Sequence, residues 1–203
     1  MADVKESKIK KNINKEDIGA LEEWLFALTS DSFSSWDRLP DIGLYMDQVL
    51  TMMERQLLFY RRSKEEKILT QAMINNYTKD GLLPRAADKK YTPGHIALLS
   101  ILCSLKPILS ISDLKMLLTS LHDNESEKDV YSFFLETQGE TLEDVKKQTT
   151  DLMESIKHTE SDRDFSDARH ELALLALRLA VDARVRLLLT QKILDFFVEE
   201  KTD

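Results

Sequence analysis

The chain has few of the residues that form cross-links, tight turns or membrane spans. Its 203 residues include one cysteine, five glycines and four prolines. Cys103 has no partner for an internal disulfide, and there is no Cys-x-x-Cys pair to bind zinc. The scarcity of glycine and proline disfavours a sandwich of many short strands and favours long helices. No run reaches the roughly 18 apolar residues that a membrane-spanning helix requires.

Apolar residues are nevertheless sufficient for a folded core, because 42% of the chain is hydrophobic. The Lys-rich start, residues 1–15, lacks the apolar stretch of a signal peptide. A single cysteine also fits a reducing compartment. We therefore predict a soluble cytoplasmic protein of one or two domains that makes no membrane contact.

Charge is distributed unevenly along the sequence. Between Leu44 and Leu121 there are 11 lysines and arginines against 7 acids, whereas the whole chain carries a net charge of −8. A basic centre between acidic flanks is one arrangement that binds a polyanion. Charged residues on solvated helical faces give the same asymmetry, so charge alone leaves both interpretations open.

The spacing of apolar residues, together with caps and stops, predicts an all-α fold. In chain order, the expected helices run from Asn14, over 43–60, from Thr70 to Gly81, from Thr92 to Pro107, from Ser110 to Leu121, from Thr141 to about residue 155, and over 167–199. Gly139 is expected to separate an aromatic segment from the helix that Thr141 caps. The ten residues before Thr92 are too few for a helix, and brief extended segments near Ala87 and Asp88 would form a very short β-hairpin.

No pattern of catalytic or metal-binding residues stands out. The pair His170-Glu171 opens a zinc-protease motif, but leucine stands where the second histidine would be. Only Gly81 and Gly94 lie within 20 residues of each other, so a Gly-rich phosphate loop is missing. Cys103 lies in the middle of an apolar helix and is expected to be buried and inert. We expect no catalytic residues, no metal and no cofactor.

The order of elements between Thr70 and Leu121 is more informative. A short capped helix is followed by a Gly-Leu-Leu-Pro stop, a basic link and two further capped helices. This order is typical of a winged helix-turn-helix, in which a short helix enters the major groove and the wing contacts phosphates. A minor helix of a bundle with a polar, solvated face would show the same pattern.

The polar residues of this region are the expected DNA contacts. On a helical wheel of about 100° per residue, Met73, Ile74 and Tyr77 point to the core and the polar side chains point away. Amides can pair with adenine, and cations can neutralise phosphates. The predicted DNA-binding residues are Thr70, Gln71, Asn75, Asn76, Thr78 and Lys79 on the helix, and Arg85, Lys89 and Lys90 on the link.

Three segments carry a resemblance to known DNA-binding domains. Residues 73–85 (Met-Ile-Asn-Asn-Tyr-Thr-Lys-Asp-Gly-Leu-Leu-Pro-Arg), 89–92 (Lys-Lys-Tyr-Thr) and 109–114 (Leu-Ser-Ile-Ser-Asp-Leu) resemble the DNA-binding domain of MerR-type regulators. The resemblance implies a winged helix-turn-helix fold. Asn75 and Asn76 stand where that family has an arginine and a tyrosine, and Lys89 replaces its wing arginine.

A bacterial family known only as a domain of unknown function, DUF1836, is resembled more closely. The similarity lies in residues 43–49 (Gly-Leu-Tyr-Met-Asp-Gln-Val) and in the run from Leu69 to Tyr77, and it extends over about residues 39–121. This resemblance implies no activity.

We therefore predict an all-α protein with a MerR-like winged helix-turn-helix core, flanked by N- and C-terminal helices. The predicted parts are an N-terminal arm (1–38), the winged domain (39–122) and a C-terminal helical region for dimerisation or sensing (123–203). The expected function is that of a homodimeric transcriptional regulator that binds double-stranded DNA. The alternative is a helical protein-interaction module with a degenerate winged-helix fold, which the net charge of −8 favours, and a small-molecule enzyme ranks third.

Overall fold

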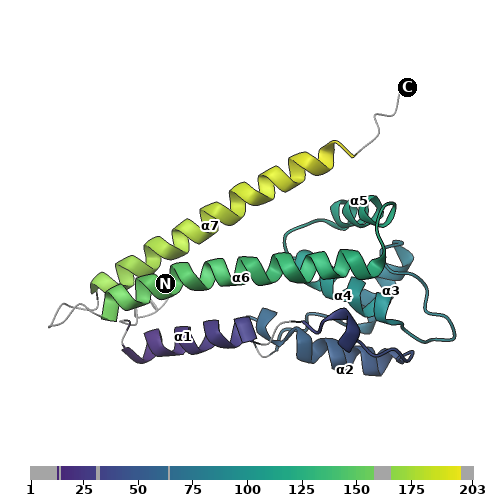
Figure 1. Cartoon of the computed structure of the whole chain (residues 1–203), viewed down its shortest axis with the longest axis horizontal. Helices are drawn as coiled ribbons and strands as arrows, with labels where there is room; N and C mark the ends of the chain where they lie inside the picture. The colour runs from purple at the N-terminus through teal and green to yellow at the C-terminus, as the bar shows by residue number, and fades with distance from the viewer. Residues whose placement is uncertain (1–12, 14, 31–32, 64, 158–165, 198–203) are drawn as a thin grey trace, which may run out of the picture.

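The structure is a computed structural model that describes residues 13, 15–30, 33–63, 65–157 and 166–197 (Figure 1). Within these ranges it contains seven α-helices, two 3-10 helices and only isolated β-bridges. The α-helices are α1 (Lys15–Ser30), α2 (Met46–Gln56), α3 (Gln71–Lys79), α4 (Pro93–Leu105), α5 (Ile111–His122), α6 (Glu127–Lys157) and α7 (Ser166–Asp195), and the 3-10 helices are η1 (Trp36–Arg38) and η2 (Leu58–Tyr60). The predicted all-α class is confirmed.

The long helix α6 organises the molecule. Helices α2 to α5 gather around its first half, and we call this part, residues 33–136, the head (Figure 1). Helix α1 packs along the second half of α6, and α7 starts at the far end of α6 and runs back toward α5. None of the helices in the described ranges has both the length and the apolar character needed to cross a bilayer.

Helix α4 forms the centre of the head. Every residue from Gly94 to Cys103 is buried, between α2 on one side and α6 on the other. Its start is the predicted one, because Thr92 precedes Pro93 and the Thr92 amide donates to Nδ1 of His95 at 3.1 Å. The start of α5 is also as predicted, with Ser110 and Asp113 exchanging hydrogen bonds of 3.1 and 3.2 Å.

The expected break at Gly139 is wrong. Helix α6 runs through it without interruption, and Thr141 is an interior residue whose hydroxyl donates to the Thr137 carbonyl at 2.8 Å. A glycine inside a helix costs about 1 kcal/mol relative to alanine, and the packing of α6 against α1 and α4 outweighs that cost. Local composition therefore predicted an interruption that the tertiary contacts remove.

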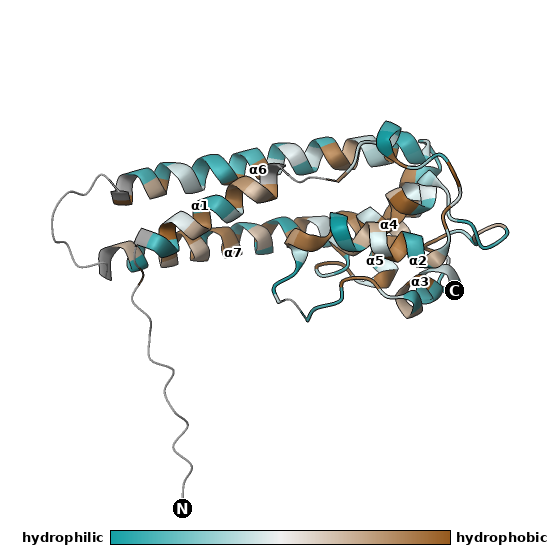
Figure 2. Ribbon diagram, turned by 90° about the horizontal axis from the view of Figure 1, so that it is seen from below, coloured by the Kyte–Doolittle hydropathy of each residue, from teal (hydrophilic) through white to brown (hydrophobic). Residues whose placement is uncertain are grey.

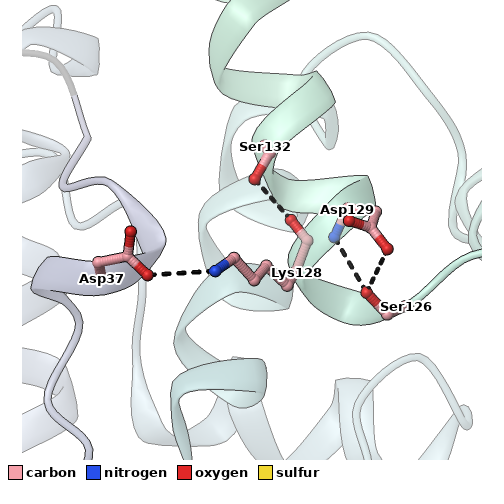
Figure 3. Close-up of polar contacts among 5 residues, drawn as sticks. All are labelled: Asp37, Ser126, Lys128, Asp129 and Ser132. Atoms are coloured by element: carbon pink, nitrogen blue, oxygen red, sulfur yellow. Dashed lines mark hydrogen bonds and ion pairs between the residues drawn. The ribbon is translucent and has the colours of Figure 1, made fainter.

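The actual start of α6 lies in the polar stretch before it. The Ser126 hydroxyl accepts from the Asp129 amide at 3.2 Å and donates to the Asp129 carboxylate at 2.6 Å, as Figure 3 shows. In the same turn, Lys128 reaches Asp37 of η1 at 3.2 Å. About one turn further along α6, the Tyr131 hydroxyl donates to the Ser34 carbonyl at 2.9 Å. These contacts attach the first turns of α6 to the segment before α2.

Other helix boundaries differ modestly from those expected. The helix predicted over 43–60 is divided, because α2 ends at Gln56 and continues as the 3-10 helix η2. The predicted Asn14 cap lies outside the described residues. Helix α7 ends at Asp195, short of the expected Glu199, and contributes Leu194 to the same core cluster as Phe33, so that cluster draws on both ends of the chain.

Candidate functional site: a polar cleft beside α3

Helix α3 is short because its sequence marks both ends. At the start, the Thr70 hydroxyl accepts from the Met73 amide at 3.2 Å. At the end, Gly81 adopts a φ of +75°, and the Leu82 amide returns to the Tyr77 carbonyl at 2.8 Å. With the Gly81 amide also bonded to Thr78 at 3.3 Å, this is a Schellman stop, which requires a residue that tolerates positive φ.

The two faces of α3 are those that the helical wheel predicts. Ile74 and Tyr77 are buried and Met73 is half-buried, and burial raises the pKa of the Tyr77 phenol to about 12. Because this phenol faces the core, it is not available to a ligand. Four of the predicted residues are exposed on the other face: Gln71, Asn75, Asn76 and Lys79.

The link between α3 and α4 contains one tight turn. Ala87 and Lys90 form an antiparallel bridge, and the Lys90 amide donates to the Ala87 carbonyl at 2.8 Å. Asp88 and Lys89, between them, have φ values of 50° and 61°, which is the backbone signature of a two-residue type I′ turn. The expected short hairpin is therefore reduced to a single bridge that projects Lys89 into solvent.

The base of this turn is fixed to the segment that leads into α2. Leu44 and Tyr91 form a second antiparallel bridge, with hydrogen bonds of 2.9 and 2.8 Å between their backbones. The Tyr45 amide next to it donates to the Gln48 side chain at 2.9 Å, which closes the first turn of α2. The start of α2, the turn and α3 thus enclose a common space.

That space is an open cleft of about 690 Å³. Three elements line it: α3 with Gln71, Asn75 and Thr78, the link with Arg85, Ala86, Lys89 and Tyr91, and the start of α2 with Tyr45, Met46 and Asp47. The cleft brings together five of the nine predicted site residues, which are Gln71, Asn75, Thr78, Arg85 and Lys89.

The other four predicted residues do not line the cleft. Thr70 uses its hydroxyl as the cap of α3, and Asn76 and Lys79 are exposed on α3 but do not line the cleft. The stem of Lys90 lies against Gly43, where an added Cβ would come within 2.7 Å of the Cβ of Lys90. Thr78 lines the cleft, but its hydroxyl donates to the Ile74 carbonyl at 3.0 Å.

Sequence reasoning missed the α2 wall of the cleft. Tyr45, Met46 and Asp47 all contribute to it, and Asp47 adds a carboxylate to a lining that also contains the two cations, Arg85 and Lys89. The only signal for this wall was the similarity of residues 43–49 to the family with no known function. Helical periodicity could not find it, because the contact depends on the pairing of Leu44 with a residue far along the chain.

The groups in the cleft are suited to binding. Its lining offers two amides, two cations, one carboxylate and two phenols, without a paired nucleophile and base. Among the described residues, no group of three or more histidines, cysteines or acids could hold a metal ion. The amides of α3 and the cations of the link can donate hydrogen bonds and positive charge to a ligand that is rich in acceptors.

The cleft lies inside the part of the chain that matches a known family. The profile of a family described as "Domain of unknown function (DUF1836)" matches residues 34–136, just over half of the chain. This protein belongs to the DUF1836 family. The match to DUF1836 covers the head from residue 34, including the whole cleft, and leaves out α1, α7 and the part of α6 after residue 136. Searches of curated proteins and of solved structures found no match.

Proposed function

We propose that this protein is a non-enzymatic transcriptional regulator that binds double-stranded DNA, with α3 in the major groove and the turn at Lys89 on the phosphates. The observation that carries the proposal is the cleft, where exposed amides of α3 and exposed cations of the link line one surface. Base-edge and backbone contacts must be made together for sequence to be recognised.

The chemistry of α3 suits a base-reading role. Gln71 and Asn75 are four residues apart on the exposed face, so both amides lie on the same side of the helix. Asparagine and glutamine can each make paired hydrogen bonds to adenine, and a major groove about 12 Å wide admits an α-helix. Asn76 and Lys79, one position further round and at the last turn, would contact bases or phosphates at the edge of the groove.

The link suits contact with the phosphate backbone. Lys89 and Lys90 stand at a type I′ turn and Arg85 leads into it, so three cations occupy a short, projecting segment. We further propose that α3, this turn, α4 and α5 form a MerR-like winged helix-turn-helix. Support comes from the order of these elements and from the resemblance of residues 73–85, 89–92 and 109–114 to MerR-type domains.

A second candidate is a protein-interaction module that uses the same surface. It is favoured by Asp47, which places a negative charge in the cleft, and by the net charge of −8. Acids elsewhere on the surface repel DNA phosphates, and this repulsion opposes binding most strongly at low salt, where screening is least. A partner with mixed charge would not meet that repulsion.

Selection from pooled random duplexes by the full chain, at several salt concentrations, tests DNA binding. We expect enrichment of a sequence motif and a log affinity that falls linearly with log salt. Substitution of Arg85 and Lys89 by alanine should reduce the slope by about one unit for each lost phosphate contact. Asn75→Ala should instead change which bases are selected.

Lys147→Ala is the matched control, because Lys147 is an exposed lysine on α6 outside the cleft. Its salt slope should equal that of the unsubstituted chain. Absence of enrichment at low salt, with circular dichroism showing a folded helical protein, would overturn the proposal and leave the interaction module.

A further inference from the structure

Helix α7 carries apolar residues on two opposite faces. Its inner face turns toward α5 and α6, and the side chains of Leu187 and Leu194 on that face pack against the core. Its outer face carries five residues that are each between 47% and 61% exposed: Leu174, Leu177, Val181, Val185 and Leu188. We call these five residues the outer stripe, and Figure 2 shows apolar residues recurring along the whole helix.

The outer stripe cannot be covered by closing α7 onto its own chain. At about 100° per residue, Val181 lies on the side of α7 opposite to Leu194, which is 2% exposed in the core. Four more exposed apolar residues extend the surface toward the C-terminus: Leu189, Ile193, Phe196 and Phe197. An exposed apolar stripe along a helix is typical of an interaction site.

The spacing of the outer stripe indicates what covers it. Successive stripe residues are separated by three, four, four and three positions, an average of 3.5, which is the repeat of a coiled coil. This pattern reads the same in both directions around Val181. A second α7 that runs antiparallel would therefore place Val181 against its own copy, and Leu174 against Leu188.

The charges beside the outer stripe match the same register. Arg178 and Asp182 lie on one edge of the stripe. An antiparallel copy centred on Val181 brings Arg178 of each chain near Asp182 of the other chain. Asp182 already accepts from Arg186 at 2.8 Å, and a carboxylate has room for a second donor. Toward the ends, Glu171 of one copy comes level with Gln191 of the other, one position away from Lys192.

We propose that two copies of this chain associate through an antiparallel pair of α7 helices centred on Val181. The outer stripe forms the buried seam of the pair, and Arg178 and Asp182 form two symmetric ion pairs beside it. This inference rests on α7 alone and is independent of DNA binding by the cleft.

Sedimentation equilibrium of the full chain at micromolar concentration tests the association. We expect twice the 23.5 kDa mass of one chain, and we expect Val181→Glu to give the single-chain mass, because two carboxylates would meet at the centre of the seam. Phe133→Glu is the matched control, since Phe133 is an apolar residue on α6 that is even more exposed than Val181, and it should keep the doubled mass. A single-chain mass for the unsubstituted protein, or for the Phe133 variant, would overturn the proposal.

Cysteine cross-linking tests the register without requiring that Val181→Glu folds. An equimolar mixture of Leu174→Cys and Leu188→Cys chains should form a mixed disulfide dimer under mild oxidation, and neither variant should do so alone. Cys103 does not compete, because it is buried and burial raises its thiol pKa to about 12. Cross-linking of Leu174→Cys with itself would indicate parallel helices and would contradict the antiparallel register.

Discussion

Tyr77 places a hydroxyl among the apolar side chains of the head. The residue is 2% exposed, and within the described part of the chain its hydroxyl has no hydrogen-bond partner. A buried polar group without a partner costs about 1–3 kcal/mol. We expect Tyr77→Phe to leave the free energy of unfolding unchanged or to raise it by about 1 kcal/mol, as measured by urea denaturation.

The same substitution bears on the function of α3. If the Tyr77 hydroxyl contributed a phosphate contact, Tyr77→Phe would weaken DNA binding. Its inward position predicts no change in affinity. A loss of stability greater than about 1 kcal/mol would show that the hydroxyl has a partner after all.

His95, at the start of α4, should make the stability of the fold depend on pH. Burial holds the pKa of His95 below its usual 6.5, and its Nδ1 accepts the Thr92 amide, so the folded chain favours the neutral ring. Between the folded-state pKa of His95 and 6.5, the unfolded chain therefore binds more protons than the folded chain. The free energy of unfolding should fall as the pH decreases below 6.5 and through the lower folded-state pKa.

His95→Gln isolates this effect. Glutamine at the same helix position can still accept the Thr92 amide, but it does not titrate. We expect the variant to lose less stability than the unsubstituted chain between neutral and mildly acidic pH, as followed by denaturant unfolding at each pH. An equally steep decline in both proteins would assign the pH dependence to other groups, such as Glu54, whose pKa is lowered by Arg61.

At the scale of the helix, α6 contains one glycine, Gly139, whose replacement by alanine should stabilise the helix. Gly139 lies near the middle of α6, and apart from its chain neighbours and the adjacent backbone of α6, no atom comes within 4 Å of where its Cβ would be. Alanine should fit there without displacement and should raise the free energy of unfolding by about 0.5–1 kcal/mol. Thermal unfolding of Gly139→Ala would show this as a higher midpoint, whereas a lower midpoint would mean that α6 needs the glycine.

The helices that sequence could predict are those whose ends are fixed by adjacent residues. Thr70 and Gly81 delimit α3, and Ser110 caps α5, through hydrogen bonds to neighbours in the chain. Helix α6 could not be predicted whole, because glycine at 139 favours a break locally and only distant contacts with α1 and α4 offset it. Caps act within one turn, whereas packing acts across the fold.

At the scale of the molecule, about half of the cleft follows from the sequence. The outward face of α3 is set by helical periodicity, so Gln71 and Asn75 could be assigned to it in advance. The α2 wall with Asp47 depends on the bridge between Leu44 and Tyr91, which joins segments far apart in the chain. Neither composition nor periodicity contains information about such a pairing.

That bridge also determines how force would pass through the head. Its two backbone hydrogen bonds make the Lys89 turn and the entry to α2 a single mechanical unit. Val49 and Met53 continue this unit into the core, where both are fully buried on the side of α2 that packs against α4. A force applied at the tip of the turn would therefore reach the centre of the head through two backbone hydrogen bonds and the buried face of α2.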